Sequence, residues 1–183
     1  MDLRNITEFL RDMWNYIVII LIVVIIFTFV VAFQPVAGNS MHPNLKEGNV
    51  IAVSKFAYKL GKPKRNDIVV LKDKNNKSFV KRIIGLPGEK IEYLDNYLYI
   101  DGDAFKEKFL GEDIVTSSFL FEDICSIEDC PKGVIPADMY LVMGDNRPQS
   151  DDSRNPEFGL VSKKQLKGKM LIRIWPLNQF GKV

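Results

Sequence analysis

The most apolar stretch of this 183-residue chain is an uninterrupted run near the N-terminus. Residues 16–33 read YIVIILIVVIIFTFVVAF and carry no charged side chain. At 1.5 Å per residue, a helix of this length nearly crosses the roughly 30 Å hydrocarbon core of a bilayer. Trp14 and Tyr16 lie at the start of the run, where amphipathic rings prefer the membrane interface. The pattern predicts a transmembrane helix over residues 16–33, preceded by a short segment, residues 1–15.

A cleaved signal peptide is the alternative interpretation of this run. Its apolar part would span roughly 7–15 residues behind a distinctly basic segment. Here the run is longer, and Arg4 and Arg11 are mixed with acidic residues, which favours a retained anchor. Only Lys46 follows within twenty residues of the run, so the positive-inside rule predicts residues 1–15 in the cytoplasm and residues 34–183 outside it. We expect a single-pass protein of the plasma membrane.

Beyond residue 34 the pattern changes to short apolar runs bounded by Gly, Pro, Asn and Asp, which is typical of strands. The predicted strands are 50–54, 68–71, 79–84, 90–94, 97–100, 139–143 and 170–175. Asp95-Asn96 is a candidate two-residue hairpin turn, and no long helical period appears. The prediction is a mainly β, antiparallel, barrel-like or sandwich domain over residues 34–183. Residues 101–136 are acidic and irregular, and we expect an insertion there.

Candidate chemistry begins in the polar segment G-N-S-M-H-P-N-L, residues 38–45, directly after the apolar run. Pro43 disfavours helix in the residue before it, so a turn is expected around Ser40. This segment is either a plain linker or a turn that presents Ser40 as a nucleophile at the membrane surface. His42, the only histidine, is two residues away in an extended turn, so a Ser–His–Asp triad is disfavoured and a surface position is expected.

Lys81 is the second candidate, within the predicted strand F-V-K-R-I-I. Strand alternation places it on one face with Phe79 and Ile83, whose apolar surfaces would lower the pKa of its ammonium group. We expect the neighbouring Arg82 to act in the same direction. A lysine that is neutral near pH 7 can serve as general base for a serine hydroxyl. The alternative is an edge-strand lysine whose ammonium group reaches water.

The third candidate is G-D-N-R-P-Q-S-D-D-S-R, residues 144–154, the most polar stretch of the chain. Its alternating Asp and Arg residues predict paired charges that hold a loop in shape, although a solvated surface loop has the same composition. The spacing of a calcium-binding loop is missing.

Composition excludes several classes of function. The net charge of +2, without a basic stripe, argues against nucleic acid and is compatible with weak attraction to anionic lipids. Cys125 and Cys130 are the only cysteines, which leaves a small-loop disulfide and free thiols both open. A zinc site is not expected, since no second cysteine pair is present.

Together these stretches resemble the type I signal peptidases, membrane-bound serine–lysine proteases that remove signal peptides from exported proteins. The resemblance rests on the anchor, then G-N-S-M-H-P-N-L, N-D-I-V-V-L, F-V-K-R-I-I-G-L-P-G-E, G-D-N-R-P-Q-S-D-D-S-R and I-R-I-W-P, in the family's order. The short insertion and single span are similar to the compact Gram-positive type. Cleavable repressor-like autoproteases and a non-enzymatic anchored binding domain are the remaining alternatives.

The resemblance implies a role for each matched residue. Ser40 corresponds to the nucleophile, Lys81 to the general base, and Ser150 to the serine that orients the lysine. Asp152 and Arg154 correspond to a supporting charged pair, and Asp145, Asn146 and Arg147 to structural residues. Gly38 stands where some members have a hydroxyl that helps to bind the oxyanion, so backbone N–H groups, chiefly that of Ser40, are expected to bind it here.

The family also implies substrates and partners. These are signal-peptide-bearing preproteins with small residues at the first and third positions before the cut, and the lipid bilayer. No metal or organic cofactor is implied, and we expect the protein to act as a monomer.

Overall fold

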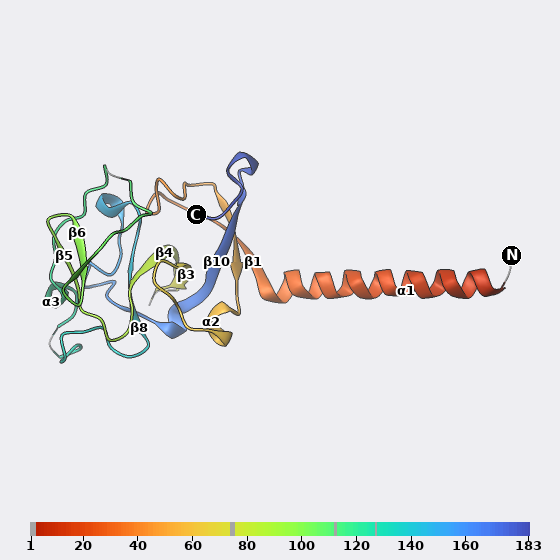
Figure 1. The fold of residues 1–183 in the computed structure, drawn as a ribbon, viewed down its shortest axis with the longest axis horizontal. Helices are drawn as coiled ribbons and strands as arrows, with labels where there is room; N and C mark the ends of the chain where they lie inside the picture. The colour runs from red at the N-terminus through yellow and green to blue at the C-terminus, as the bar shows by residue number, and fades with distance from the viewer. Residues whose placement is uncertain (1–2, 74–75, 112, 127) are drawn as a thin grey trace.

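A long N-terminal helix projects from a β domain in the computed structural model (Figure 1). The structure describes residues 3–73, 76–111, 113–126 and 128–183, so residues 1 and 2 of the predicted cytoplasmic segment and residues 112 and 127 of the predicted insertion lie outside it. Helix α1 (Leu3–Ile25) continues as a π-helical turn, η1 (Ile26–Val30). Its window Arg11–Val30 has the length and composition for one membrane span, and the rest of the chain does not cover it.

The predicted end of the membrane helix at residue 33 was wrong by three residues. Val31 to Phe33 belong to strand β1 (Val31–Pro35), which pairs antiparallel with β2 (Val50–Ser54). Apolar, partly β-branched residues suit either a membrane helix or a strand, so the hydrophobic pattern alone did not mark the change. The pairing with β2 hydrogen-bonds one side of this edge strand and places the start of the sheet directly after the helix.

Two antiparallel sheets build the domain, which confirms the mainly β prediction. The larger has the order β1-β2-β10-β3-β4-β8-β9, and the smaller has the order β5-β6-β7. The remaining strands are β3 (Ile68–Lys72), β4 (Ser78–Gly85), β5 (Ile91–Leu94), β6 (Tyr97–Ile100), β7 (Asp103–Phe105), β8 (Met139–Met143), β9 (Val161–Ser162) and β10 (Leu166–Trp175). The short helices are α2 (Ala57–Leu60), α3 (Phe121–Ile124), η2 (Arg147–Gln149), η3 (Lys163–Gln165) and η4 (Leu177–Gln179).

All seven predicted strands are present, with differences at their ends. Asp95 and Asn96 form the turn between β5 and β6 with positive φ angles of 49° and 67°, as a tight hairpin turn requires. Strand β10 begins at Leu166, four residues before its predicted start. There every second residue is buried, Leu166, Gly168 and Met170, but the lysines between them hid the pattern. The short strands β7 and β9 were also missed.

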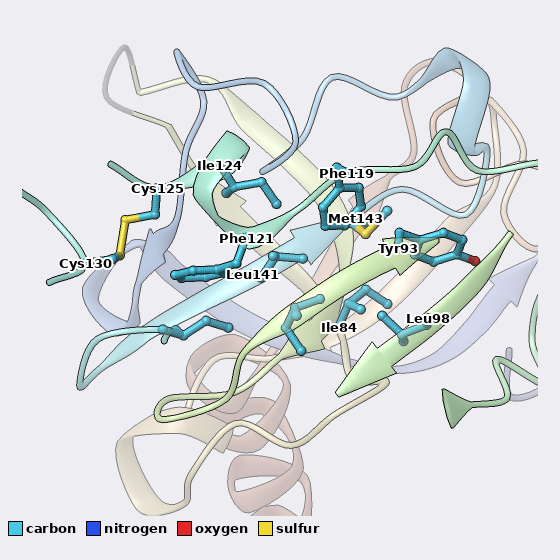
Figure 2. Close-up of a cluster of buried hydrophobic side chains, with 12 residues drawn as sticks. Ile84, Tyr93, Leu98, Phe119, Phe121, Ile124, Cys125, Cys130, Leu141 and Met143 are labelled. Carbon is cyan, nitrogen blue, oxygen red and sulfur yellow. A yellow bond between two sulfur atoms is a disulfide. The ribbon is translucent and has the colours of Figure 1, made fainter. Parts of the chain in front are cut away.

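The predicted insertion, residues 101–136, shares a hydrophobic core with the main sheet. Phe119 and Phe121 pack in one buried cluster with Leu141 of β8 and Ile84 of β4 (Figure 2). Cys125 and Cys130 form a disulfide at the edge of this cluster, which settles the alternative that the sequence left open. The segment is therefore placed to support the neighbouring loop that carries the polar motif.

Candidate active site

The turn that carries Ser40 is held by a buried side chain on each side of its proline. Met41 and Leu45 are almost fully buried in a core cluster, and the Leu45 N–H donates to the Met41 carbonyl oxygen at 2.8 Å. Ser40 itself is half-buried, and His42 is exposed, as predicted. Gly38 adopts a φ of 75°, a left-handed conformation that explains glycine at this position. The apolar anchors fix the turn while leaving Ser40 at the surface of the core.

The polar loop after β8 binds this turn directly. The Asn146 N–H donates to the Ser40 carbonyl oxygen at 3.0 Å, and the Asn146 side-chain amide donates to the Asn39 carbonyl oxygen at 3.0 Å. More than 100 residues separate the two segments in sequence. Asn146 therefore fixes the position of the Ser40 turn relative to the polar loop. Its place in the polar motif did not reveal this role.

Lys81 is buried in β4, with 1% of its surface exposed. Its Nζ lies 5.9 Å from the centre of the Phe79 ring, so the two share a face as the strand alternation predicted. Burial lowers the pKa of Lys81 to about 8. The Asp152, Asp151 and Asp145 carboxylates oppose this shift, while the Arg154 guanidinium adds to it. The amine is thus predominantly neutral in mildly alkaline solution.

Arg82, which was expected to help lower this pKa, is not among the main causes of the shift. Arg82 follows Lys81 in the strand, so its side chain points to the opposite face. There it donates two hydrogen bonds to the Asp145 carboxylate, at 2.9 and 2.7 Å, and its guanidinium lies 4.1 Å from the centre of the Phe109 ring. The arginine that does act on Lys81 is Arg154, from the polar loop.

Ser150 contacts the buried amine. The Lys81 Nζ donates to the Ser150 Oγ at 2.9 Å, so this hydroxyl fixes the direction of the lysine side chain. The Ser150 side chain also hydrogen-bonds to Asp152. The predicted contact between Ser150 and Lys81 is therefore present in the structure.

Asp152 and Arg154 form a salt bridge behind Ser150, with Arg154 Nε 2.8 Å from Asp152 Oδ1. Burial opposes ionisation of Asp152, but hydrogen bonds from Arg154, Ser150 and the Gly144 N–H hold the pKa of its carboxyl group below the usual value. Arg154 also donates to the Arg147 carbonyl oxygen at 2.7 Å. The pair thus stabilises the loop on which Ser150 is carried.

Residues of the 101–136 segment complete this support through contacts with the motifs. The buried guanidinium of Arg147 pairs with Glu107 at 2.5 Å and donates to the Thr116 hydroxyl at 3.0 Å. Asn44 donates to Asp145 at 2.8 Å and to the Phe109 carbonyl oxygen at 2.8 Å. The sequence offered no signal for Glu107 or Thr116, since both lie in the irregular segment and act only through distant partners.

Gly144 is the point at which the serine turn and the polar loop meet. A Cβ built at this position would lie 2.2 Å from the Ser150 Oγ and 2.3 Å from the Ser40 carbonyl oxygen. Gly144 follows β8 immediately, and Met143 at the end of β8 pairs with Arg82, so Gly144 also lies beside Lys81. The absence of a side chain at Gly144 therefore allows the Ser40 backbone to approach Ser150, whose hydroxyl accepts the hydrogen bond from Lys81.

We expect Gly144→Ala to lower the catalytic rate by about 100-fold, because a displacement of about 1 Å in an active site has effects of this size. The added methyl group has to displace either the Ser40 backbone or Ser150. Turnover of a precursor by the purified variant measures this. Gly111→Ala is the matched control, since a Cβ there meets nothing within 4 Å. An active Gly144→Ala enzyme would show that the close packing is not needed.

Comparison with known proteins places this site in a family. The family profile described as "Signal peptidase, peptidase S26" matches residues 9–175. Signal peptidase IB of Staphylococcus aureus is 37% identical over 181 residues, which cover 94% of this chain and 93% of that protein. Signal peptidase I of Bacillus caldolyticus is 36% identical over 175 residues, 92% of each chain.

A solved structure agrees with the sequence matches. The crystal structure of a signal peptidase I from Enterococcus faecalis V583 aligns with a TM-score of 0.50 at 37% identity, and covers 61% of this chain and 98% of that one. The matches define the class of the protein, a serine endopeptidase. The chain belongs to the signal peptidase family, peptidase S26, which confirms the resemblance seen in its motifs.

Proposed function

We propose that this protein is a membrane-anchored endopeptidase that cleaves N-terminal signal peptides from exported preproteins, with Ser40 as nucleophile and Lys81 as general base. The main supporting observation is the buried Lys81 amine, whose pKa is lowered to about 8 and which Ser150 holds at 2.9 Å beside the Ser40 turn. The similarity to signal peptidases IB and I supports the choice of substrate.

In the proposed reaction, the Ser40 Oγ attacks the scissile carbonyl carbon while the neutral Lys81 amine accepts the hydroxyl proton. The carbon–nitrogen bond then breaks, and Lys81 returns the proton to the leaving amine. A water molecule, deprotonated by the same amine, then attacks the acyl-enzyme ester; the bond between the acyl carbon and the Ser40 Oγ breaks, and Lys81 returns the proton to the Ser40 Oγ. Asp152 and Arg154 act indirectly: they position Ser150 and its loop and do not contact the reacting atoms.

The oxyanion of the tetrahedral intermediate requires a donor beside Ser40. We assign this to the Ser40 backbone N–H, which donates no hydrogen bond to any residue that the structure describes. A Cβ at Gly38 would meet nothing within 4 Å, which supports an open space on that side of the turn. We infer that the free Ser40 N–H donates to the substrate carbonyl oxygen.

Cleavage of a signal-peptide-bearing precursor by the purified full chain tests the proposed activity, and its pH dependence tests the base. The rate of acylation is expected to rise with pH through a midpoint near 8, because the protonated amine has no lone pair for the Ser40 proton. Single-turnover rates measured over about pH 6 to 10 give this profile. A rate that still rises tenfold per pH unit up to about pH 10, as for a lysine with the ordinary pKa of 10.5, would exclude the buried Lys81 as the base.

We further propose that the span Arg11–Val30 anchors the protein in the plasma membrane with the catalytic domain outside. Arg4 and Arg11 on the N-terminal side support this orientation. Protease added to right-side-out vesicles is expected to digest the domain and to spare an N-terminal tag. A protected domain would reverse the orientation. A mature chain that begins near Gly38 would instead show that the run is a cleaved signal peptide.

A further inference from the structure

Residues 105–109, with the sequence FKEKF, begin at the last residue of β7 and lie outside the three catalytic motifs. We call this segment the strap. Its side chains alternate in the structure, and the two lysines are exposed. The partly buried side chains between and beside them are Phe105, Glu107 and Phe109. Three side chains of the strap therefore face the rest of the domain.

Each inward side chain of the strap contacts an arginine from a different element. Both aromatic rings lie near a guanidinium group, and the carboxylate forms a salt bridge. The pairs are Phe105 with Arg65 before β3, at 5.4 Å from ring centre to guanidinium carbon, Phe109 with Arg82 of β4, at 4.1 Å, and Glu107 with Arg147 of the polar loop. Such contacts are attractive. The strap thus joins segments that are distant in sequence.

Phe109 contacts both the lysine strand and the serine turn. Its ring covers the guanidinium of Arg82, the residue after Lys81, whose salt bridge with Asp145 is almost fully buried, with side chains 3% and 1% exposed. The Phe109 carbonyl oxygen accepts a hydrogen bond from Asn44, in the serine turn, at 2.8 Å. A buried ion pair is stable only where its partners stay together away from water. Phe109 therefore stabilises the junction between the strand, the turn and the polar loop.

Glu107 holds the beginning of the polar loop. Both of its carboxylate oxygens bind the guanidinium of Arg147, and the two side chains are 4% and 0% exposed. The Tyr93 hydroxyl donates to the same carboxylate at 2.7 Å. Arg147 in turn donates through its Nε to the carbonyl oxygen of Gly144, the residue against which Ser150 packs. Glu107 thus fixes the backbone beside Ser150.

We propose that the strap positions the catalytic groups: Phe109 and Glu107 hold the serine turn, the strand of Lys81 and the polar loop in their relative places. Both act through an arginine and not on the reacting atoms, so they are positioning residues. The inference rests on the proposed function, in which Lys81 is the general base. A weaker strap lets the three elements separate, which moves Ser150 away from Lys81 and admits water to the buried amine.

Phe109→Ala tests the aromatic contact. We expect kcat for precursor cleavage to fall at least about tenfold, because small displacements of reacting groups have effects of this size, and KM to change much less. The midpoint of the pH profile should move upward from near 8, since water at the amine stabilises its protonated form. Phe109→Tyr keeps the ring and should restore the wild-type rate and midpoint. The matched control is Lys108→Ala, at an exposed neighbouring position, which should equal the wild type.

Glu107→Gln tests the salt bridge and separates charge from position. Removal of a negative charge would by itself lower the pKa of Lys81, whereas displacement and hydration of the amine raise it. An upward shift therefore reports positioning. The charged groups that act on Lys81 are unchanged in every variant of the strap: Asp145, Asp151, Asp152 and Arg154.

Nitrogen NMR of the Lys81 amine in the full chain, assigned with Lys81→Met, follows the same titration without turnover. Failure of the wild type to cleave a precursor would refute the proposed function, and this titration would still test the strap. Unchanged titration in Phe109→Ala and Glu107→Gln would overturn the strap proposal, and so would an equal shift in Lys108→Ala. If thermal unfolding shows that Phe109→Ala is not folded at the assay temperature, Phe109→Leu replaces it and should show the same shift at smaller size.

Discussion

Ser40→Ala is expected to abolish precursor cleavage and to leave the thermal unfolding midpoint almost unchanged. Ser40 is half-buried, and the fixed parts of its turn are the buried side chains of Met41 and Leu45 and the hydrogen bond from Asn146 to the Ser40 carbonyl oxygen. The substitution keeps all of these and removes only the hydroxyl. Loss of the nucleophile of a serine protease lowers kcat by several orders of magnitude, up to about 10⁶-fold.

Single-turnover cleavage of a precursor by the full chain is the measurement. Ser117→Ala is the matched control, because Ser117 is exposed and outside the site, and its rate should equal that of the wild type. Ser40→Ala enzyme that retains more than about a tenth of the wild-type rate would exclude Ser40 as the nucleophile. Trapping of an acyl-enzyme on the wild type but not on the variant would identify the attacking atom more directly.

Lys81→Arg is expected to be almost inactive at every pH at which the protein is folded. A guanidinium remains protonated, so it cannot accept the Ser40 proton, although it keeps the positive charge of the lysine. The position is also almost fully buried, with 1% exposure, so the larger and permanently charged group should lower the unfolding midpoint as well. A loss of at least about 10³-fold in the rate is expected, in line with the removal of a general base.

Lys81→Met separates the chemical effect from the structural one. Methionine has a similar length and no charge to bury, so this variant should be equally inactive while its unfolding midpoint stays near that of the wild type. Lys132→Arg makes the same substitution at an exposed position. This control variant should be fully active. Cleavage by Lys81→Arg at close to the wild-type rate would mean that another group is the base.

Ser150→Ala tests the hydrogen bond between Lys81 and Ser150. It removes the hydroxyl that accepts the Lys81 hydrogen bond at 2.9 Å but leaves the amine itself in place. We therefore expect a smaller loss of rate than in Lys81→Met. The midpoint of the pH profile should also move, because the lysine loses one partner and Asp152 loses a hydrogen-bond donor. A lower rate with an unchanged pH profile would indicate a merely structural role.

The sequence by itself determined the parts of this protein that depend on neighbouring residues. Uninterrupted apolar residues mark the helix, alternation and bounding turn residues mark the strands, and Asp95-Asn96 marks a hairpin turn. These features follow from local backbone and hydrophobic preferences. The order of the motifs also identified the family, and strand alternation placed Lys81 on one face with Phe79.

The tertiary structure alone decided which charges and backbone segments meet. Arg82 pairs with Asp145 across 63 residues, so the guanidinium that acts on Lys81 comes from Arg154 instead. Glu107 and Thr116 hold Arg147, although neither lies in a recognisable sequence pattern, and Cys125 forms its disulfide with Cys130. Glycine is needed at position 144 because the Ser40 turn and the Ser150 side chain occupy the space that a Cβ would fill. Contacts of this kind depend on the packing of distant strands, whose register no short stretch of residues specifies.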